Sequence, residues 1–131
     1  MKKLQLKTSS SLSNYLFSLQ LSYKKKYQTR KKKQERFDKA YLRIALEWAK
    51  LSHCERKQVG AIIVKGRMII SDGFNGTPTG FENCCEDEEG KTQWYVLHAE
   101  ANAILKVANS TNSCEGATPV SYTHLTLPTK A

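Results

Sequence analysis

A histidine and a glutamate two residues apart open a helical segment in the stretch His98-Ala99-Glu100-Ala101-Asn102-Ala103-Ile104. Histidine is a common ligand of Zn²⁺, and a carboxylate beside the metal can take a proton from water and pass it on. In the pattern His-x-Glu…Pro-Cys-x-x-Cys of zinc-dependent hydrolytic sites, His98 would be a ligand and Glu100 the proton shuttle, although a His-x-Glu pair alone is weak evidence. The other ligands of that pattern come from its Cys-x-x-Cys, a motif found nowhere in the 131 residues.

Hydrophobic periodicity predicts the elements around this stretch. Apolar residues recur at helical spacing over 37–51, which predicts an amphipathic helix. Two short apolar runs, 59–64 and 68–71, are separated by a turn-forming Lys-Gly-Arg and predict a two-stranded hairpin. The order helix, strand, strand, helix is typical of half of a three-layer α/β domain. The second helix is expected to begin near His98, and the side chains expected to be buried on it are Ala101, Ile104, Leu105 and Ala108.

A loop rich in turn-forming residues follows the hairpin, Gly73-Phe74-Asn75-Gly76-Thr77-Pro78-Thr79-Gly80. Three further motifs are Val59-Gly60-Ala61-Ile62-Ile63, Asn83-Cys84-Cys85 and Cys114-Glu115-Gly116-Ala117-Thr118. With these motifs and the His-x-Glu stretch, residues 37–118 resemble the N-terminal half of the deoxycytidylate (dCMP) deaminase family, in the cytidine deaminase-like superfamily. The Gly-aromatic-Asn-Gly-x-Pro-x-Gly loop separates this branch from other deaminases.

The resemblance implies a three-layer α/β/α fold and the hydrolysis of dCMP to dUMP plus ammonia, a step of cytoplasmic pyrimidine nucleotide metabolism. It implies Zn²⁺ as cofactor, with His98 as a ligand and Glu100 as the catalytic proton shuttle. It also implies that Asn75 hydrogen-bonds the nucleotide and that the backbone N–H of Ala99 lies beside the base. The implied partners are a nucleotide substrate, further copies of the complete enzyme in a homo-oligomer, and dCTP and dTTP as effectors.

From Pro119 onward the sequence departs from the family. The family continues into a third strand and then into Pro-Cys-x-x-Cys, whereas residues 119–131 are rich in Pro, Ser and Thr. We therefore expect an unrelated tail and a domain truncated after the catalytic helix. We also expect this chain to be inactive, because the two cysteine ligands are missing. The strand over 59–64 would then keep one unpaired edge, which favours aggregation over a cooperative fold.

Charge divides the chain into a leader and a body. Residues 1–36 carry nine Lys and two Arg against one Glu, whereas the rest carries ten Lys and Arg against eleven Asp and Glu. Blocks of like charge usually stay disordered, so a disordered basic arm is expected, with Leu16, Leu19 and Tyr23 lining at most a weak helical face. The nearly neutral body argues against nucleic acid as the main partner. No run approaches the roughly 18 apolar residues of a membrane span, so no membrane partner is expected.

The four cysteines do not predict a disulfide framework, because the chain shows no secretion signal. We expect reduced thiols in a cytoplasmic protein. An open hypothesis is a second, structural zinc at Cys54 and Cys85, next to Cys84, completed by His53 or Glu88.

Two other functions stay open. One is a tRNA adenosine deaminase or another nucleoside deaminase relic, in which the basic leader would be an RNA arm. The other is a non-catalytic, basic RNA-binding fragment. The loop that contains Asn75 and Pro78, together with the neutral body, favours the dCMP deaminase interpretation over both.

Overall fold

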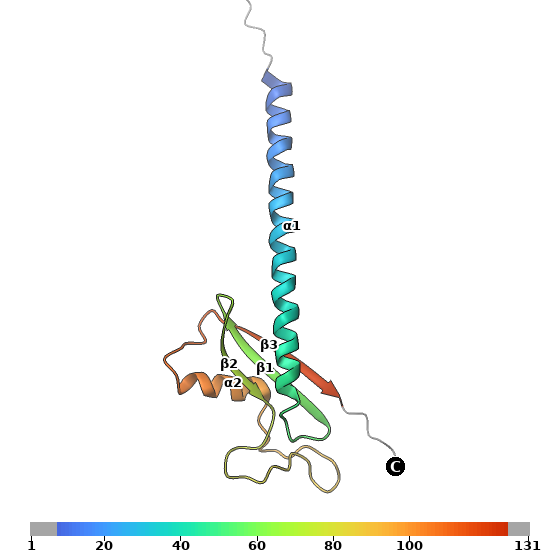
Figure 1. The fold of residues 1–131 in the computed structure, drawn as a ribbon, viewed down its shortest axis with the longest axis vertical. Coiled ribbons are helices and arrows are strands. Elements are labelled where there is room, and N and C mark those ends of the chain that lie inside the picture. Colours follow the sequence, from blue (N-terminus) through green and yellow to red (C-terminus); the bar gives the residue numbers. More distant parts are fainter. Residues whose placement is uncertain (1–7, 126–131) are drawn as a thin grey trace, which may run out of the picture. The chain divides into compact units, whose positions relative to one another are not determined.

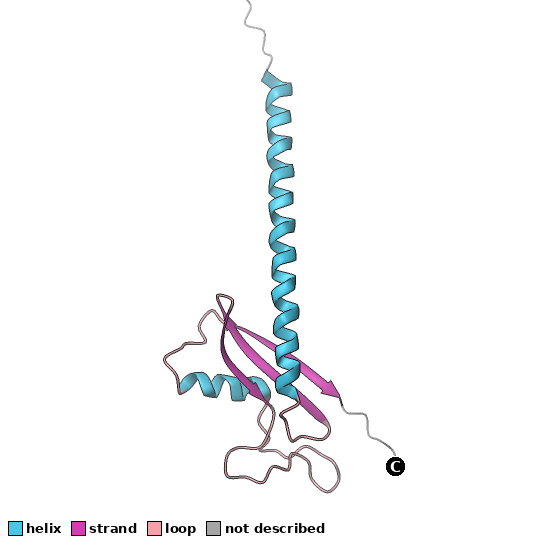
Figure 2. Ribbon diagram, viewed as in Figure 1, coloured by secondary structure: helices cyan, strands magenta, loops and turns pink. Residues whose placement is uncertain are grey.

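The computed structural model describes residues 8–125, which form two helices and three strands (Figures 1 and 2). In chain order they are α1 (Thr8–Ala49), β1 (Lys57–Lys65), β2 (Met68–Phe74), α2 (Ala99–Ala108) and β3 (Thr118–Leu125). The chain divides into two compact units on either side of the bond between Phe37 and Asp38, and all three strands belong to the second unit. No helix within residues 8–125 is both long and apolar enough to span a lipid bilayer.

The sheet has the strand order β2-β1-β3, and both outer strands run antiparallel to β1. A two-residue turn, Gly66-Arg67, joins β1 to β2, and both residues have positive φ angles of 55° and 66°. This is the backbone conformation of the commonest two-residue hairpin turns. The register shifts between Ile63 and Val64, which places Ile70 of β2 in a β-bulge. The predicted hairpin is confirmed.

Two helices cover opposite faces of this sheet. Gly60 of β1 faces the backbone of α1 at Ala45. Gly73 of β2, which pairs with Ala61, faces the backbone of α2 at Ala103. Since successive strand residues point to opposite faces, the C-terminal turns of α1 and the whole of α2 lie on different sides of the sheet. The three-layer α/β/α arrangement is confirmed, and it explains why β1 is a continuous apolar run.

The predicted amphipathic helix is confirmed in the C-terminal turns of α1. Tyr41, Ala45 and Ala49 are buried at a spacing of four residues. The Tyr41 hydroxyl donates a hydrogen bond of 3.0 Å to the carbonyl of Arg67, which ties the helix to the hairpin turn. Leu51, which was predicted to share the buried face, lies beyond the helix and is exposed.

The prediction of a disordered leader is wrong for residues 8–36, which form the N-terminal part of α1. This segment contains neither Gly nor Pro, and its Leu, Lys, Gln and Arg residues have high helix propensity. Two hydroxyls that often compete with helix formation instead bond to the preceding turn. Ser18 donates to the Tyr15 carbonyl at 2.9 Å, and Thr29 donates to the Lys25 carbonyl at 3.0 Å.

The prediction that the third strand is missing is wrong, whereas the prediction that the tail is unrelated to the family stays a prediction. β3 pairs with β1 from Lys57↔Leu125 to Val64↔Thr118. Half-buried Val120 and Tyr122 alternate with exposed neighbours, as in a strand with one covered face. Pro in such a strand is tolerated at the edge of a sheet, where its missing N–H can face away from the neighbour.

The third strand changes two further expectations. β3 follows α2 in the same sheet, so the described domain continues for one strand beyond this helix. β1 is paired along both of its edges, so the expected unpaired edge is absent from the part of the chain that the structure describes. Residues 126–131 of the predicted tail lie outside the described residues.

Candidate functional site

The His-x-Glu pair lies at the start of α2. His98 is the N-cap residue, with an extended backbone (φ −66°, ψ 151°) and an exposed side chain that makes no capping hydrogen bond. Ala99 begins the helix and is completely buried, and Glu100 is half-buried in the first turn. The helix dipole favours a carboxylate at this position. Three of the predicted site residues therefore meet at one helix end.

Asn75 directly follows β2, and its side chain is bound to the backbone of β1. Its Nδ2 donates to the Lys57 carbonyl at 2.9 Å, and its Oδ1 accepts from the Val59 N–H at 2.8 Å. Its own N–H donates to the Val59 carbonyl at 3.0 Å. An amide side chain has two N–H groups and two acceptor positions, so each end keeps one that these two bonds do not use. Sequence reasoning missed this structural role, because it depends on the pairing of β1 with β2.

A pair of backbone hydrogen bonds connects the loop after β2 to the start of α2. The Gly76 N–H donates to the Leu97 carbonyl at 3.2 Å, and the Leu97 N–H donates to the Gly76 carbonyl at 2.9 Å. Gly76 follows Asn75 and Leu97 precedes His98 in the chain. This bridge therefore brings all four predicted site residues, Asn75 and residues 98–100, to the same end of the sheet.

The buried face of α2 differs from the predicted one. Ala99, Ala103 and Val107 are buried at a spacing of four residues, whereas Ile104 and Leu105 are 51% and 55% exposed. The cause is Gly73, where an added Cβ would lie 2.4 Å from the Ala99 carbonyl oxygen. The helix backbone lies directly on the strand, so small side chains face the sheet. The predicted stripe of Ala101, Ile104, Leu105 and Ala108 is wrong.

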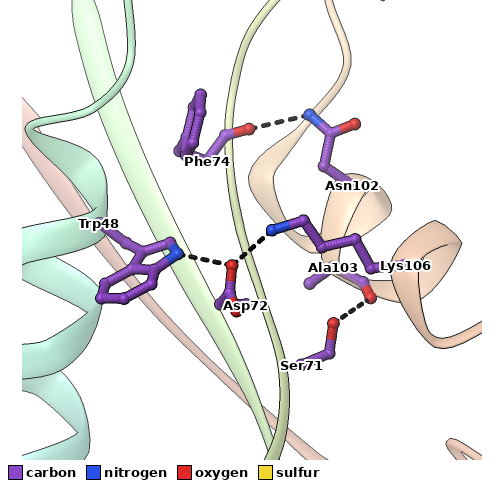
Figure 3. A network of polar contacts seen from close by, with 7 residues as sticks. All are labelled: Trp48, Ser71, Asp72, Phe74, Asn102, Ala103 and Lys106. Atoms are coloured by element: carbon purple, nitrogen blue, oxygen red, sulfur yellow. Dashed lines mark hydrogen bonds and ion pairs between the residues drawn. The ribbon is translucent and has the colours of Figure 1, made fainter. Parts of the chain in front are cut away.

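Asp72 of β2 links both helices to the sheet (Figure 3). Its Oδ1 accepts hydrogen bonds from Trp48 Nε1 of α1 at 2.6 Å and from Lys106 Nζ of α2 at 2.5 Å. Partial burial raises the pKa of Asp72, but the hydrogen bonds from Lys106 and Trp48 and the positive charge of Lys106 outweigh it. The pKa of Asp72 is therefore lowered from its usual value of 3.8. Sequence reasoning did not single out this residue, whose two partners are remote in the chain.

Two further hydrogen bonds set the position of α2 along β2 (Figure 3). Asn102 Nδ2 donates to the Phe74 carbonyl at 2.8 Å, and the buried Ser71 hydroxyl donates to the Ala103 carbonyl at 2.7 Å. Packing of apolar faces alone would not determine how far α2 is shifted along β2, whereas hydrogen bonds to two particular backbone carbonyls do. They fix the register of the helix that carries residues 98–100. In the sequence, these contacts were indicated only by Asn102, a polar residue among the alanines of the His-x-Glu stretch.

We expect the Asp72→Asn variant to lose an acid-sensitive part of the stability. The lowered pKa of Asp72 stabilises the fold above its usual value of 3.8, and this contribution disappears as pH falls through the lower folded value. The variant should be less stable near neutral pH and should show a flatter decline below about pH 4. Urea unfolding at a series of pH values measures this. Glu88→Gln, at an exposed carboxylate, is the control. An identical acid slope in Asp72→Asn and the native chain would contradict the network.

Cys54 and Cys85 form a disulfide with a Cα–Cα distance of 5.0 Å across 31 residues of sequence. The expectation of reduced thiols is wrong at this pair, and its two sulfurs are bonded to each other rather than available as thiolate ligands. Glu86 reinforces the same junction, because its carboxylate accepts the N–H groups of Glu55 and Arg56, both at 3.1 Å. The loop before α2 is therefore attached to the segment that enters β1.

Alkylation of the unreduced chain under denaturing conditions is expected to modify two cysteines, Cys84 and Cys114, which are free in the structure. Full reduction should raise the number to four, because Cys54 and Cys85 are then released. Intact-mass measurement counts the modified thiols. The Cys84→Ser variant should lower the unreduced count to one. Modification of all four cysteines without a reductant would contradict the pairing.

The residues within 8–125 do not assemble the zinc site that the His-x-Glu motif implies. A hydrolytic zinc site needs three protein ligands and an open position for water. In this range, no three side chains of His, Cys, Asp or Glu lie together in a way that could hold a metal ion. His98 supplies one ligand, and the whole sequence contains no Cys-x-x-Cys. The described residues therefore do not fit a catalytic zinc ion.

Comparison with known proteins identifies the family. Residues 35–126 match the family model for the cytidine and deoxycytidylate deaminase zinc-binding region. The chain is 36% identical over 83 residues to the deoxycytidylate deaminase of Mycobacterium phage D29, a match that covers 53% of this chain and 65% of the phage protein. It is also 36% identical over 81 residues to the deoxycytidylate deaminase of Schizosaccharomyces pombe, covering 53% of this chain and 25% of the yeast protein.

Solved structures agree with this result. The crystal structure of dCMP deaminase from the cyanophage S-TIM5 in complex with dCMP and dUMP superposes with a TM-score of 0.61 and 46% sequence identity. That match covers 63% of this chain and 62% of the phage chain, so the similarity spans less than two thirds of the relatives. The cytidine deaminase-like fold is thereby confirmed. The chain belongs to the family defined by the cytidine and deoxycytidylate deaminase zinc-binding region.

Proposed function

We propose that this chain carries the nucleotide-facing half of a dCMP deaminase site, and that its 131 residues alone do not complete the reaction. The observation that carries the proposal is the backbone bridge between Gly76 and Leu97, which holds Asn75 at the same end of the sheet as residues 98–100. The similarity to a cyanophage dCMP deaminase crystallised with dCMP and dUMP supports dCMP as the substrate.

Each residue of this half-site has a proposed role. Asn75 binds the nucleotide through the donor and acceptor that its bonds to β1 leave over. The backbone N–H of Ala99 contacts the base. Glu100 moves protons, and His98 is one zinc ligand of the complete site.

Hydrolytic deamination defines what Glu100 would do. Water adds to the carbon that bears the exocyclic amine, and the amine leaves as ammonia, so protons must pass from water to the ring and to the leaving amine. Glu100, a half-buried carboxylate in the first turn of α2, would carry them. In the family, zinc supplies the activated water, and the residues within 8–125 provide only part of its ligand set. We therefore expect the isolated chain to be inactive.

Three further features belong to this proposal through the family resemblance. The complete enzyme would assemble as a homo-oligomer, dCTP and dTTP would act as its effectors, and it would act in the cytoplasm. The relatives named above support neither the tRNA adenosine deaminase alternative nor the RNA-binding alternative.

Titration of the full chain with dCMP, followed by amide NMR, tests the half-site. We expect the backbone signal of Ala99 and the side-chain signal of Asn75 to shift at millimolar dCMP. Deoxyribose 5-phosphate, which lacks the base, should leave the Ala99 signal unchanged. If dCMP shifts neither signal, or if the sugar phosphate alone reproduces both shifts, the proposed roles are wrong.

A further inference from the structure

The N-terminal part of α1 exposes a row of apolar side chains, which we call the apolar stripe: Leu12, Leu16, Leu19, Tyr23 and Tyr27. Their spacings of four, three, four and four residues place them on one side of the helix. They are between 47% and 73% exposed. Soluble proteins rarely leave a large contiguous apolar surface in water, and such a surface commonly marks an interaction site.

A basic segment, residues 24–36, follows directly along the same helix. It carries eight Lys and Arg residues against the single acid Glu35, whereas residues 8–23 carry no charged side chain. The cations occur as Lys24-Lys25-Lys26, Arg30, Lys31-Lys32-Lys33 and Arg36, so they surround the helix. A parallel second copy would bring these cations against one another, and an antiparallel copy that pairs the two stripes would leave the basic segments without anionic partners, so self-association does not account for the charge. The charge is complementary to a polyanion.

We propose that residues 10–36 bind the surface of an anionic phospholipid bilayer. The apolar stripe would enter the boundary between headgroups and acyl chains, and the basic segment would bind lipid phosphates. Tyr23 and Tyr27 lie where the uncharged and basic parts meet, and tyrosine is enriched at such interfaces. A nucleic acid would satisfy the cations but would leave the stripe in water. A bilayer surface accounts for both features, with the helix lying on the membrane. This proposal replaces the expectation of no membrane partner, which rested only on the lack of a membrane-spanning run.

Co-sedimentation of the full chain with lipid vesicles tests the proposal. One vesicle preparation contains phosphatidylcholine alone, and the other contains equal parts of phosphatidylcholine and phosphatidylserine. We expect at least about tenfold stronger binding to the anionic vesicles, decreasing with added salt. Replacing Lys31, Lys32 and Lys33 by Gln should remove most of this preference.

Two matched variants distinguish vesicle binding through the apolar stripe from nonspecific hydrophobic adsorption. Leu16→Glu places a charge in the stripe, and Leu21→Glu makes the same change elsewhere on the helix at a residue of similar exposure. Leu16→Glu should weaken vesicle binding by about tenfold or more, and Leu21→Glu should change it much less. Equal effects of the two variants would overturn the proposal. Tight binding of single-stranded RNA that Leu16→Glu does not weaken, with no binding to anionic vesicles, would also overturn it and assign the basic segment to nucleic acid.

Discussion

The Gly60→Ala variant is expected to destabilise the domain by about 3 kcal/mol or more, at the upper end of the cost of overpacking. An added Cβ at Gly60 would lie 1.9 Å from the Ala45 carbonyl oxygen and 2.4 Å from the Ala49 backbone nitrogen. Both are backbone atoms of α1, so no side-chain rotation can relieve the clash. Against a net stability of about 5–15 kcal/mol, a loss of this size shifts the urea midpoint strongly. Circular dichroism during urea unfolding measures the shift.

Gly76→Ala is the matched control for this prediction. No atom lies within 4 Å of a Cβ at Gly76, and its φ is not positive. Its free energy of unfolding should stay within about 0.5 kcal/mol of the native chain, as for most substitutions without a clash. Gly73→Ala should behave like Gly60→Ala, because its Cβ would lie 2.4 Å from the Ala99 carbonyl oxygen. Equal stability of Gly60→Ala and Gly76→Ala would contradict the close packing of α1 on the sheet.

Zinc retention is expected to fall well below one ion per chain after dialysis against a mild chelator. Three protein ligands are needed for a stable hydrolytic zinc site, and His98 supplies one of them. Within residues 8–125 no further His, Cys, Asp or Glu pair lies with it as a ligand group. Metal analysis of the purified chain gives the stoichiometry.

The His98→Ala variant makes the zinc result specific to this site. Any zinc that the chain keeps should be unaffected by this change, because it would be bound elsewhere. Stoichiometric zinc that disappears in His98→Ala would show that a complete ligand set forms around this histidine. The account of an incomplete site would then be wrong.

Local patterns in the sequence were sufficient for several elements. The apolar run of β1, the Lys-Gly-Arg turn and the apolar run of β2 predicted the hairpin, because both strands and their turn are contiguous in the chain. The spacing of Tyr41 and Ala45 predicted the buried turns of α1 in the same way. The His-x-Glu stretch placed the start of α2 correctly.

Features that depend on remote contacts were not predictable in this way. The buried face of α2 is set by Gly73 on another element, so the larger side chains Ile104 and Leu105 misled the periodicity argument. β3 has few apolar residues, and its identity as a strand depends on pairing with β1. The Asp72 contacts and the Cys54–Cys85 pair likewise join segments that only the folded chain brings together.

The leader was mispredicted for a different reason. Its density of like charge argued for disorder, but a segment without Gly or Pro and rich in Leu, Lys and Gln also has a strong local preference for helix. In residues 8–36 this local preference prevails.

Turnover of dCMP by the purified 131-residue chain, with Zn²⁺ added, tests the central claim most directly. The claim is that Asn75, His98, Ala99 and Glu100 form the nucleotide-facing half of a deaminase site that lacks a complete zinc centre. We expect no dUMP above the level formed by the Glu100→Gln variant, which keeps the shape of the side chain but cannot carry the proton. Formation of dUMP that Glu100→Gln abolishes would contradict the claim.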